Sequence, residues 1–300
     1  IMTFLQNVKQ SAPGPGGIPY ACWLAAGPKG AKILKNIFSS MCNGDFPPLG
    51  FNDMLGIFLP KGAADDDTRD SVRRTAENTR PLGLKNTDNK IVAAVVNRSI
   101  TPTITENAHS AQNGFIAGRN GLNNLVTIET QARIKDHIIG SKSNLEIQEL
   151  AALALYDFFA AFPSVAHKFI FIVLKALKLP TGLYNFFTAL YKNNRCFGRI
   201  NGCFYFLFAI LADIIQGCPA SGSIFVLVVD CFLRLLVSLD PNSTTCAFAD
   251  DIGHLIASLK SLDKFYRALN FFQRASGLAL NIKKCVLIPL AEQLTPKLRG

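Results

Sequence analysis

Two adjacent aspartates, Asp250 and Asp251, stand between the apolar, strand-prone stretches 244–248 and 252–256. This pattern predicts a β-hairpin with both carboxylates at or near its turn. Two like charges so close repel each other, and the pair is tolerated if water solvates it or a cation binds it. Hard divalent ions such as Mg²⁺ bind carboxylate oxygens together with phosphates. For this pair alone, an Asp-rich turn without chemistry is the simpler interpretation.

A third carboxylate, Asp157, follows the apolar run 151–156 and precedes more aromatic residues. A charge in such a setting is costly unless it is paired or bound to a metal. Asp157 lies 93 residues before Asp250, so only the fold can bring the two together. A helix cap or a turn residue at a strand end is the alternative for Asp157 alone. Together the three aspartates predict one shared site.

The charge balance indicates a polyanionic partner. The 300 residues carry a formal net charge of +10, and residues 151–300 hold 15 basic and eight acidic side chains. No acid occurs from residue 158 to residue 212. A basic protein of this kind suits a nucleic acid, and an anionic membrane surface is the other possibility.

Other classes of site are disfavoured. The eight cysteines show no Cys-x-x-Cys spacing and the four histidines are scattered, which argues against zinc or haem. Six of the cysteines lie among apolar neighbours and are interpreted as small core residues of a protein in an intracellular, reducing compartment, nuclear or cytoplasmic: Cys196, Cys203, Cys218, Cys231, Cys246 and Cys285. Polar residues interrupt the apolar stretch 203–239, so we expect no spanning helix and no membrane partner. No signal peptide is expected.

The elements that must position the carboxylates follow from periodicity and turn residues. Strands are expected at 55–59, from Arg80, at 151–156, on both sides of Asn201-Gly202, at 244–256 and at 280–289. Helices are expected at 31–42, 88–98 (capped by Asp88), 129–139, 165–177, 181–191 (capped by Thr181) and 261–276. One more helix is expected to follow the loop 213–225 and to end at about residue 239. This order predicts an α+β fold in which helices back an antiparallel sheet.

Eight blocks in order resemble the reverse transcriptases of non-LTR retrotransposons, between about residues 11 and 289. The blocks are SAPGPGGIPY (11–20), IFLPKG (57–62), RPLGLKNTDNKIVAAVVNRSI (80–100), QNGFIAGRN (112–120), YDFFAAF (156–162), QGCPASGSIF (216–225), AFADD (247–251) and GLALNIKKC (277–285). Three departures stand out: Gly17 replaces the usual Asp, Gly83 a frequent Ser, and Phe248 the more usual Tyr.

The resemblance implies a right-hand polymerase: fingers at 1–150 with the entry into the palm, an antiparallel palm sheet backed by helices at 151–290, and the start of a truncated thumb at 291–300. It implies an RNA-directed DNA polymerase that adds dNTPs to a primer 3′-OH. Two Mg²⁺ ions, or Mn²⁺ in their place, would serve as cofactors, with an RNA template and a DNA primer as partners. The alternatives are an inactive remnant that binds nucleic acid, or another right-hand polymerase such as an intron-encoded enzyme. Oligomeric state is left open.

The resemblance also assigns roles to single residues. Asp157 and Asp250 would bridge the metals, Asp251 would be the nearby third carboxylate, and Lys284 beside Lys283 would protonate pyrophosphate. The expected substrate and nucleic-acid contacts are Lys61 and Arg80 on the triphosphate, Phe162 under the sugar, Gln216 and Gly217 beside the base, and Arg119 on the template backbone. The alternatives are a solvated lysine for Lys61, core packing for Phe162, a turn for Gly217 and a surface salt bridge for Arg119.

Overall fold

The computed structural model describes residues 1–140 and 146–290, and these form two compact units. The first unit combines Ile1–Thr101 with Ala166–Ser221, and the second combines Pro102–Val165 with the chain from Gly222 onward. The expected split into fingers at 1–150 and palm at 151–290 is a division by function and stays a prediction. The expected start of a thumb, 291–300, lies outside the described residues.

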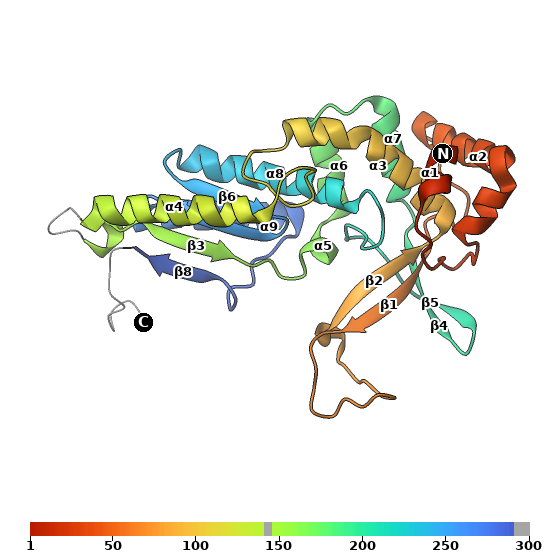
Figure 1. The fold of residues 1–300 in the computed structure, drawn as a ribbon, viewed down its shortest axis with the longest axis horizontal. Coiled ribbons are helices and arrows are strands. Elements are labelled where there is room, and N and C mark those ends of the chain that lie inside the picture. Colours follow the sequence, from red (N-terminus) through yellow and green to blue (C-terminus); the bar gives the residue numbers. More distant parts are fainter. Residues whose placement is uncertain (141–145, 291–300) are drawn as a thin grey trace. The chain divides into compact units, whose positions relative to one another are not determined.

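The second unit contains the sheet that carries the aspartates (Figure 1). Its strand order is β6-β7-β3-β8, and every neighbouring pair is antiparallel. This confirms both the α+β class and the predicted antiparallel sheet. The strands are β3 (Ala152–Tyr156), β6 (Thr244–Phe248), β7 (Asp251–Ile256) and β8 (Val286–Pro289).

The last strand is shorter than predicted from 280–289. Leu280 makes a single bridge to Phe158, and the chain then turns before β8 begins. The turn is closed by the amides of Lys284 and Cys285, which both donate to the Asn281 carbonyl, at 2.8 and 3.1 Å. Because these two backbone amides donate within the turn, they are not available to pair with a neighbouring strand.

Helices cover both faces of this sheet. Helix α4 (Gly121–Gly140) packs on one face, where a Cβ at Gly253 would lie 2.5 Å from the Ile128 side chain. Helix α9 (Leu262–Ser276) packs on the opposite face, where Phe265 makes an edge contact with His254 at 4.5 Å. Successive residues of a strand point to opposite faces, so Gly253 and His254 report the two sides.

Helix α8 (Ser221–Leu239) packs against α9, through a ring stack between Phe232 and Phe272 at 4.8 Å. It is the one helix of the described chain that is long and apolar enough to cross a membrane. The expectation that no such helix exists was therefore wrong, since Asp230 and Arg234 interrupt it without lowering its mean hydropathy of 2.1 enough. More than half of its apolar stretch is buried inside the protein, as in the core helix of a soluble domain.

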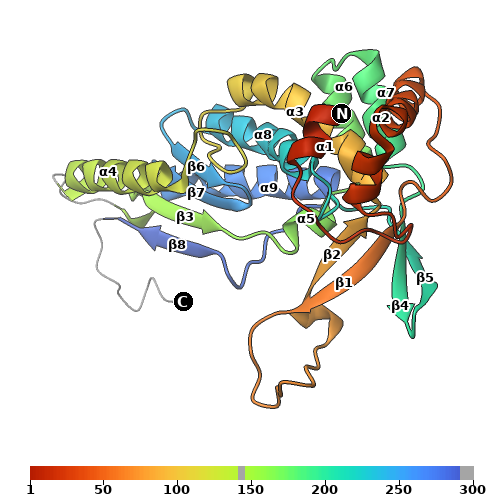
Figure 2. The same ribbon diagram turned by 45° about the vertical axis from the view of Figure 1, so that its right-hand side comes forward.

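The first unit has a sheet of its own, with strand order β2-β1-β4-β5. Two hairpins form it, and they lie side by side and project away from the helices of the unit (Figure 2). They are joined by a parallel contact of two residue pairs between β1 and β4. The sequence predicted the second hairpin and the two strands of the first, but neither the pairing of those two strands nor the shared sheet. The strands are β1 (Met54–Pro60), β2 (Thr79–Lys85), β4 (Arg195–Ile200) and β5 (Cys203–Ala209).

Four of the remaining helices were predicted and differ from prediction at their ends, whereas the two short ones at 2–7 and 161–164 were not predicted. The described residues hold α1 (Met2–Asn7), α2 (Tyr20–Asn43), α3 (Thr87–Asn107), α5 (Ala161–Ser164), α6 (His167–Ala176) and α7 (Thr181–Leu190). The expected helix 31–42 is the second part of α2, which is kinked where Gly27 leaves helical geometry before Pro28. Helix α3 begins at Thr87 and continues through Pro102, so Asp88 lies in its first turn. The N-cap of α7 is Pro180, so Thr181 is its first residue and not its cap.

Candidate active site

The antiparallel register brings Asp157 next to the aspartate pair. Tyr156 at the end of β3 pairs with Ile252 of β7. The next position along both strands therefore sets Asp157 across from Asp251, and side chains in such opposite positions have Cβ atoms about 5 Å apart. Asp250 precedes Asp251 in the β6–β7 turn. The three carboxylates, 93 residues apart in sequence, thus lie at one end of one sheet.

The electrostatics agree with this placement. Partial burial raises the pKa of Asp251, and the negative charges of Asp250 and Asp157 raise it further. Asp157 and Asp251 also line one open cavity of about 520 Å³, together with Lys284, Phe248 and residues of α4. Because these carboxylates repel one another, binding of a cation between them is favourable. A larger cavity of about 700 Å³ in the first unit is lined by lysines and apolar or hydroxyl side chains, so it offers no carboxylate.

Lys284 lies beside the first carboxylate, as the resemblance implies. Its Nζ is 3.9 Å from Asp157 Oδ2, and both side chains are partly exposed. The amide of Asn281 donates to the Asp157 carbonyl at 2.8 Å, which ties the turn before β8 to the end of β3. A cation at this distance can neutralise one carboxylate or, with a phosphate present, turn to it.

Gln112 holds the turn that presents Asp250, and sequence reasoning assigned it no role. Ala249, the first turn residue, has a φ of 58°, which is uncommon for any residue other than glycine. The fully buried amide of Gln112 accepts from the Ala249 amide at 2.9 Å and donates to the Ala249 carbonyl at 3.2 Å. Gln112 also accepts from the Gly114 amide at 2.8 Å. The QNGF block carried the signal, because a glutamine before Asn-Gly can bond a neighbouring backbone.

The segment around Gln112 covers the outer edge of β6. Ala247 donates to the Ala111 carbonyl and accepts from the Asn113 amide, each at 2.8 Å. Gly114 lies so close to the turn that a Cβ there would be 2.2 Å from the Ala249 nitrogen. The backbone groups of an edge strand are therefore paired here, which fixes the turn and its carboxylates in place.

Phe162 lies in an aromatic cluster of the second unit. Its ring is stacked on Phe225 at 4.5 Å with an interplanar angle of 5°, and it meets the exposed ring of Phe115 edge to face at 5.9 Å. Phe162 is half-buried, whereas Phe225 is fully buried. One face of the ring is thus packed as in a core, and the role under the sugar stays a prediction.

Arg119 is used by the protein's own backbone. Its guanidinium donates to the carbonyls of His109 and Gln112, both at 2.8 Å, and to those of Ala108 and Thr105 at 3.2 and 3.3 Å. The surface salt bridge considered as its alternative is therefore wrong. The expected contact with a template stays a prediction, but four hydrogen bonds already make Arg119 the clamp of the segment that carries Gln112.

The carboxylates suit a hard divalent cation. All three offer oxygen ligands, and a cation would relieve the repulsion that raises the pKa of Asp251. Within residues 1–140 and 146–290, no three His, Cys, Asp or Glu side chains converge closely enough to hold an ion by themselves. Mg²⁺ in proteins is bound through one or two carboxylates, and water and substrate phosphates complete its coordination shell.

Lys61 and Arg80 lie in the first unit, on the β1–β2 hairpin. Arg80 pairs with Leu59 in the ladder, and Lys61 follows β1 directly. The Lys61 amide donates to the Asn78 carbonyl at 2.8 Å, and its Nζ donates to the Glu77 carbonyl at 2.9 Å. Both side chains are exposed, as binding of a triphosphate requires, and Lys61 is also hydrogen-bonded rather than simply solvated.

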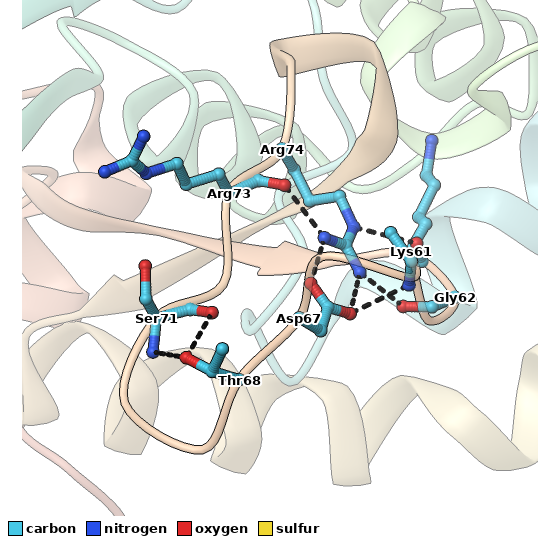
Figure 3. Close-up of polar contacts among 8 residues, drawn as sticks. Lys61, Gly62, Asp67, Thr68, Ser71, Arg73 and Arg74 are labelled. Atoms are coloured by element: carbon cyan, nitrogen blue, oxygen red, sulfur yellow. Dashed lines mark hydrogen bonds and ion pairs between the residues drawn. The ribbon is translucent and has the colours of Figure 1, made fainter.

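The loop after Lys61 is closed by a charged pair that sequence reasoning did not single out (Figure 3). Arg74 binds both carboxylate oxygens of Asp67, at 2.6 and 2.5 Å, and donates to the carbonyls of Lys61 and Gly62. This bidentate contact holds the pKa of Asp67 at about 2. Arg74 therefore links the start of this long loop, at Lys61 and Gly62, to Asp67 farther along it.

Gln216 and Gly217 are tied to β2 within the first unit. The Gly83 amide donates to the Gln216 carbonyl at 3.0 Å. A Cβ at Gly217, where φ is 104°, would lie 2.4 Å from the Gly83 carbonyl oxygen, and one at Gly83 would lie 2.3 Å from the Met54 sulfur. The backbone of β2 thus packs directly against Gly217, as a turn at this position allows, and the expected place of Gln216 and Gly217 beside the base stays a prediction.

Two titratable side chains near this loop, Lys85 and Asp213, influence each other electrostatically and were missed in the sequence. Lys85 is fully buried, donates to the Asn52 carbonyl at 2.6 Å and to the Asn194 side chain, and has its pKa lowered to about 8 by burial. Burial likewise raises the pKa of Asp213 to about 7, although the charge of Lys85 opposes it. Nothing in the local pattern distinguishes such a lysine from an exposed one.

Comparisons with known proteins place this geometry. The profile of the family "Reverse transcriptase (RNA-dependent DNA polymerase)" matches residues 65–294. The transposon TX1 uncharacterized 149 kDa protein of Xenopus laevis is 25% identical over 271 residues, which are 87% of this chain and 19% of that protein. The chain thus spans about a fifth of the curated relative that it matches.

Solved structures show the same fold. Apo telomerase from Candida tropicalis, truncated from its C-terminal domain, matches with a TM-score of 0.59 at 10% identity, over 93% of this chain and 57% of that one. Telomerase from Candida albicans in complex with the TWJ fragment of telomeric RNA matches with a TM-score of 0.57 at 8% identity, over 92% and 47%. At such low identities the likeness concerns the fold alone.

Proposed function

The chain belongs to the reverse transcriptase (RNA-dependent DNA polymerase) family, in its non-LTR retrotransposon type, and we propose that it extends a DNA primer with dNTPs on an RNA template. The observation that carries the proposal is the meeting of Asp157 with the β6–β7 turn at the end of one antiparallel sheet. The net charge of +10 supports a nucleic-acid partner.

The role that we propose for each residue follows from where its side chain lies. Asp157 and Asp250 would hold two Mg²⁺ ions, or Mn²⁺ in their place, and Asp251 would be the third carboxylate beside them. When bound, such ions stabilise the attacking 3′ oxygen and the leaving pyrophosphate in an in-line displacement. Lys284, 3.9 Å from Asp157, is placed to deliver a proton to pyrophosphate. Gln112 keeps the Asp250 turn in the geometry that binding requires.

Residues of the first unit are proposed to bind the incoming nucleotide. Lys61 and Arg80 contribute exposed cations for its triphosphate, the former as a point charge and the latter as a fork. Gln216 and Gly217 contribute the backbone beside the base. The Arg74–Asp67 pair keeps Lys61 at the base of a closed loop.

Sugar choice is proposed to depend on Phe162, whose ring stacks on Phe225. If the free face of the ring packs under the sugar, Phe162→Val opens space for a 2′-OH, and incorporation of ribonucleotides rises relative to deoxynucleotides. If the ring serves only the core, the same change leaves a cavity and lowers both activities together with the melting temperature. The ratio of incorporation efficiencies, with a melting curve alongside, decides between the two.

The decisive experiment is primer extension on an RNA template by the complete gene product that carries this chain. We expect synthesis that stops when a chelator removes divalent ions and that falls by orders of magnitude in Asp250→Asn. Binding of primed template should persist in the variant, because basic side chains and not the turn provide it.

Asp263→Asn is the matched control, since Asp263 lies exposed on α9 and, among the residues that the structure describes, pairs only with Arg267 of its own helix at 2.7 Å. Unchanged synthesis in Asp250→Asn would show that the aspartate pair is merely a turn. Template binding without synthesis by the wild type, with divalent ions present, would identify an inactive nucleic-acid-binding remnant.

A further inference from the structure

The β4–β5 hairpin of the first unit exposes an unusual set of side chains. Along β4, Arg195, Phe197 and Arg199 occupy alternate positions and therefore share one face. Strand β5 has the sequence CFYFLFA, and all seven of its residues are exposed. Four aromatic side chains and one leucine on a strand that buries neither face add nothing to the core.

The register builds these side chains into an ordered layer. Phe197 pairs with Phe206, and Arg199 pairs with Phe204. The Arg195 guanidinium lies 5.3 Å from the Phe197 ring, Phe197 meets Phe206 edge to face at 5.9 Å, and Arg199 lies 5.8 Å from the Phe204 ring. We call these five residues the Arg–Phe face. Cations and rings alternate across it, held by the strand ladder.

The Arg–Phe face is open to solvent. Phe204 is 44% exposed and Phe206 57% exposed. Strand β5 is the outer strand of its sheet, and in the described residues no strand pairs with its free edge. Proteins normally protect such an edge with charges or cover it, and an exposed apolar patch of this kind marks a binding site.

The charge of the β4–β5 hairpin indicates which class of partner it can bind. No acidic residue occurs between positions 158 and 212, so the hairpin carries positive charge only. Asp53 binds Arg195 through both carboxylate oxygens, at 2.8 and 2.7 Å, and fixes it. No acidic side chain of the described chain pairs with Arg199, whose charge is free for a ligand. A partner that fits must combine flat apolar rings with anionic groups.

We propose that the Arg–Phe face is a stacking site for single-stranded RNA. Aromatic rings on a strand surface, interleaved with arginines, stack successive bases while the cations contact the phosphates. RNA is the occupant because the proposed function supplies an RNA template, and the inference rests on that function in this respect. The site takes any base, since every base has a flat face.

Cysteine footprinting is the first test. Cys203, expected in the core, is free and exposed at the start of β5, as is Cys22 in helix α2. Cys203 precedes Phe204 and therefore points to the face opposite the Arg–Phe face, whereas Ala209 pairs with Arg195 and shares its face, so Ala209→Cys places a reporter thiol on the Arg–Phe face. An unstructured oligouridine of about 20 nucleotides, longer than the site expected on one platform, is added before alkylation with iodoacetamide. We expect alkylation at position 209 to slow several-fold and that of Cys22 to stay unchanged. Equal rates at position 209 with and without saturating RNA would overturn the proposal.

Variants of the face form the second test. Phe206→Ala should weaken binding of the oligouridine about tenfold, the size expected for loss of one base stack. Phe206→Leu should weaken it nearly as much, because leucine keeps the apolar surface but lacks the ring. Phe271→Ala is the matched control, since Phe271 lies on α9 and is 71% exposed. Full affinity in both Phe206 variants would refute stacking.

Salt dependence tests the cation. Arg199→Gln should reduce the slope of log affinity against log salt by about 0.7, the value for one lost phosphate contact on a single strand. Arg267→Gln on α9 is the matched control. An unchanged slope for Arg199→Gln would contradict the proposed role of that residue.

Two further outcomes separate this proposal from its rivals. If Cys203 is protected without RNA in a manner that depends on protein concentration, and sedimentation shows a dimer, the β5 edge pairs with a second copy and the RNA site is refuted. If the oligouridine binds as predicted but the complete protein makes no DNA, the stacking site stands and the proposed polymerase function fails.

Discussion

The hairpins β6–β7 and β4–β5 are built alike and surrounded differently. Each joins antiparallel strands through a turn of two residues, and each places one strand at the outer edge of its sheet. The edge of β6 is covered by the segment around Gln112, whereas β5 is exposed along its whole length. The covered hairpin carries carboxylates at a fixed turn, and the open one carries cations and rings on a free surface.

The difference shows how one local motif serves two kinds of chemistry. Metal binding needs oxygen atoms held in place, so the Asp250 turn is pinned by Gln112 and approached closely by Gly114. Stacking on a flexible strand of RNA needs accessible rings more than a single geometry. Cover and exposure therefore follow from what each hairpin is proposed to bind.

The largest effect is expected at the support of the covered turn. Gln112→Leu removes three hydrogen bonds and leaves backbone groups of Ala249 and Gly114 buried without partners. Each such group costs about 1–3 kcal/mol, and a displacement of about 1 Å at a reacting group can cost a hundredfold in rate. We expect primer extension to fall at least a hundredfold, measured as kcat at saturating dNTP.

The matched control is Gln273→Leu, because Gln273 is exposed on α9. Loss of activity in proportion to lost thermal stability alone would mean that Gln112 serves the fold and not the position of Asp250.

The second prediction compares apolar residues of the two hairpins. Ile252 on β7 is 2% exposed, whereas Phe206 on β5 is 57% exposed. Ile252→Ala should lower the free energy of unfolding by about 3 kcal/mol, since it leaves a cavity in the core. Phe206→Ala removes a larger side chain but should cost less than about 1 kcal/mol. Denaturant titration measures both, and equal losses would show that β5 is buried in solution.

The sequence predicted the two hairpins from the same kinds of signal and could not predict this difference between them. Asn201-Gly202 and the apolar alternation around Asp250 gave the turns correctly, because turn chemistry and strand period are local. Cover and exposure are set by distant segments: Ala111 and Asn113 pair with Ala247 across more than a hundred residues. Single residues do not reveal such pairing.

The residues of the candidate site likewise fall into those that the sequence predicted and those that it missed. The three aspartates and Lys284 were predicted from ordered motif blocks, and the structure brings them together. Gln112 and the clamp made by Arg119 were missed, since both act through backbone atoms that a sequence pattern does not display. The alternative of a salt bridge for Arg119 failed for the same reason: its acceptors are carbonyls.

The third prediction concerns pH and the buried side of β7. His254 is fully buried, neither ring nitrogen has a hydrogen-bond partner among the described residues, and burial lowers its pKa to about 4. The unfolded chain binds this proton near pH 6.5, so unfolding takes up a proton between these values. Stability from this residue is therefore present above about pH 6.5 and is lost as the pH falls toward 4, by about 3 kcal/mol.

The measurement compares the wild type with His254→Phe, which keeps a ring beside Phe265. Their difference in unfolding free energy should change by about 3 kcal/mol between pH 7 and pH 4, while other titrating groups cancel. A constant difference over that range would mean that folding does not change the pKa of His254.

The smallest effect is expected at the turns themselves. Both hairpins place a residue other than glycine at positive φ in the first turn position, with φ of 58° at Ala249 and 50° at Asn201. Asparagine tolerates this conformation, whereas alanine is strained there by about 1–2 kcal/mol. Glycine removes the strain but makes the unfolded chain more flexible, at a cost of about 0.4–1 kcal/mol. Ala249→Gly should therefore raise the free energy of unfolding by about 0.5 kcal/mol, and Asn201→Gly should leave it unchanged or lower it slightly.

Denaturant midpoints with equal slopes measure the difference, and primer extension is followed in parallel. If Ala249→Gly is instead the more destabilising of the two, packing of the Ala249 methyl group outweighs the strain. A rise in stability together with a fall in activity would show that the strained turn is what holds Asp250 in its working position.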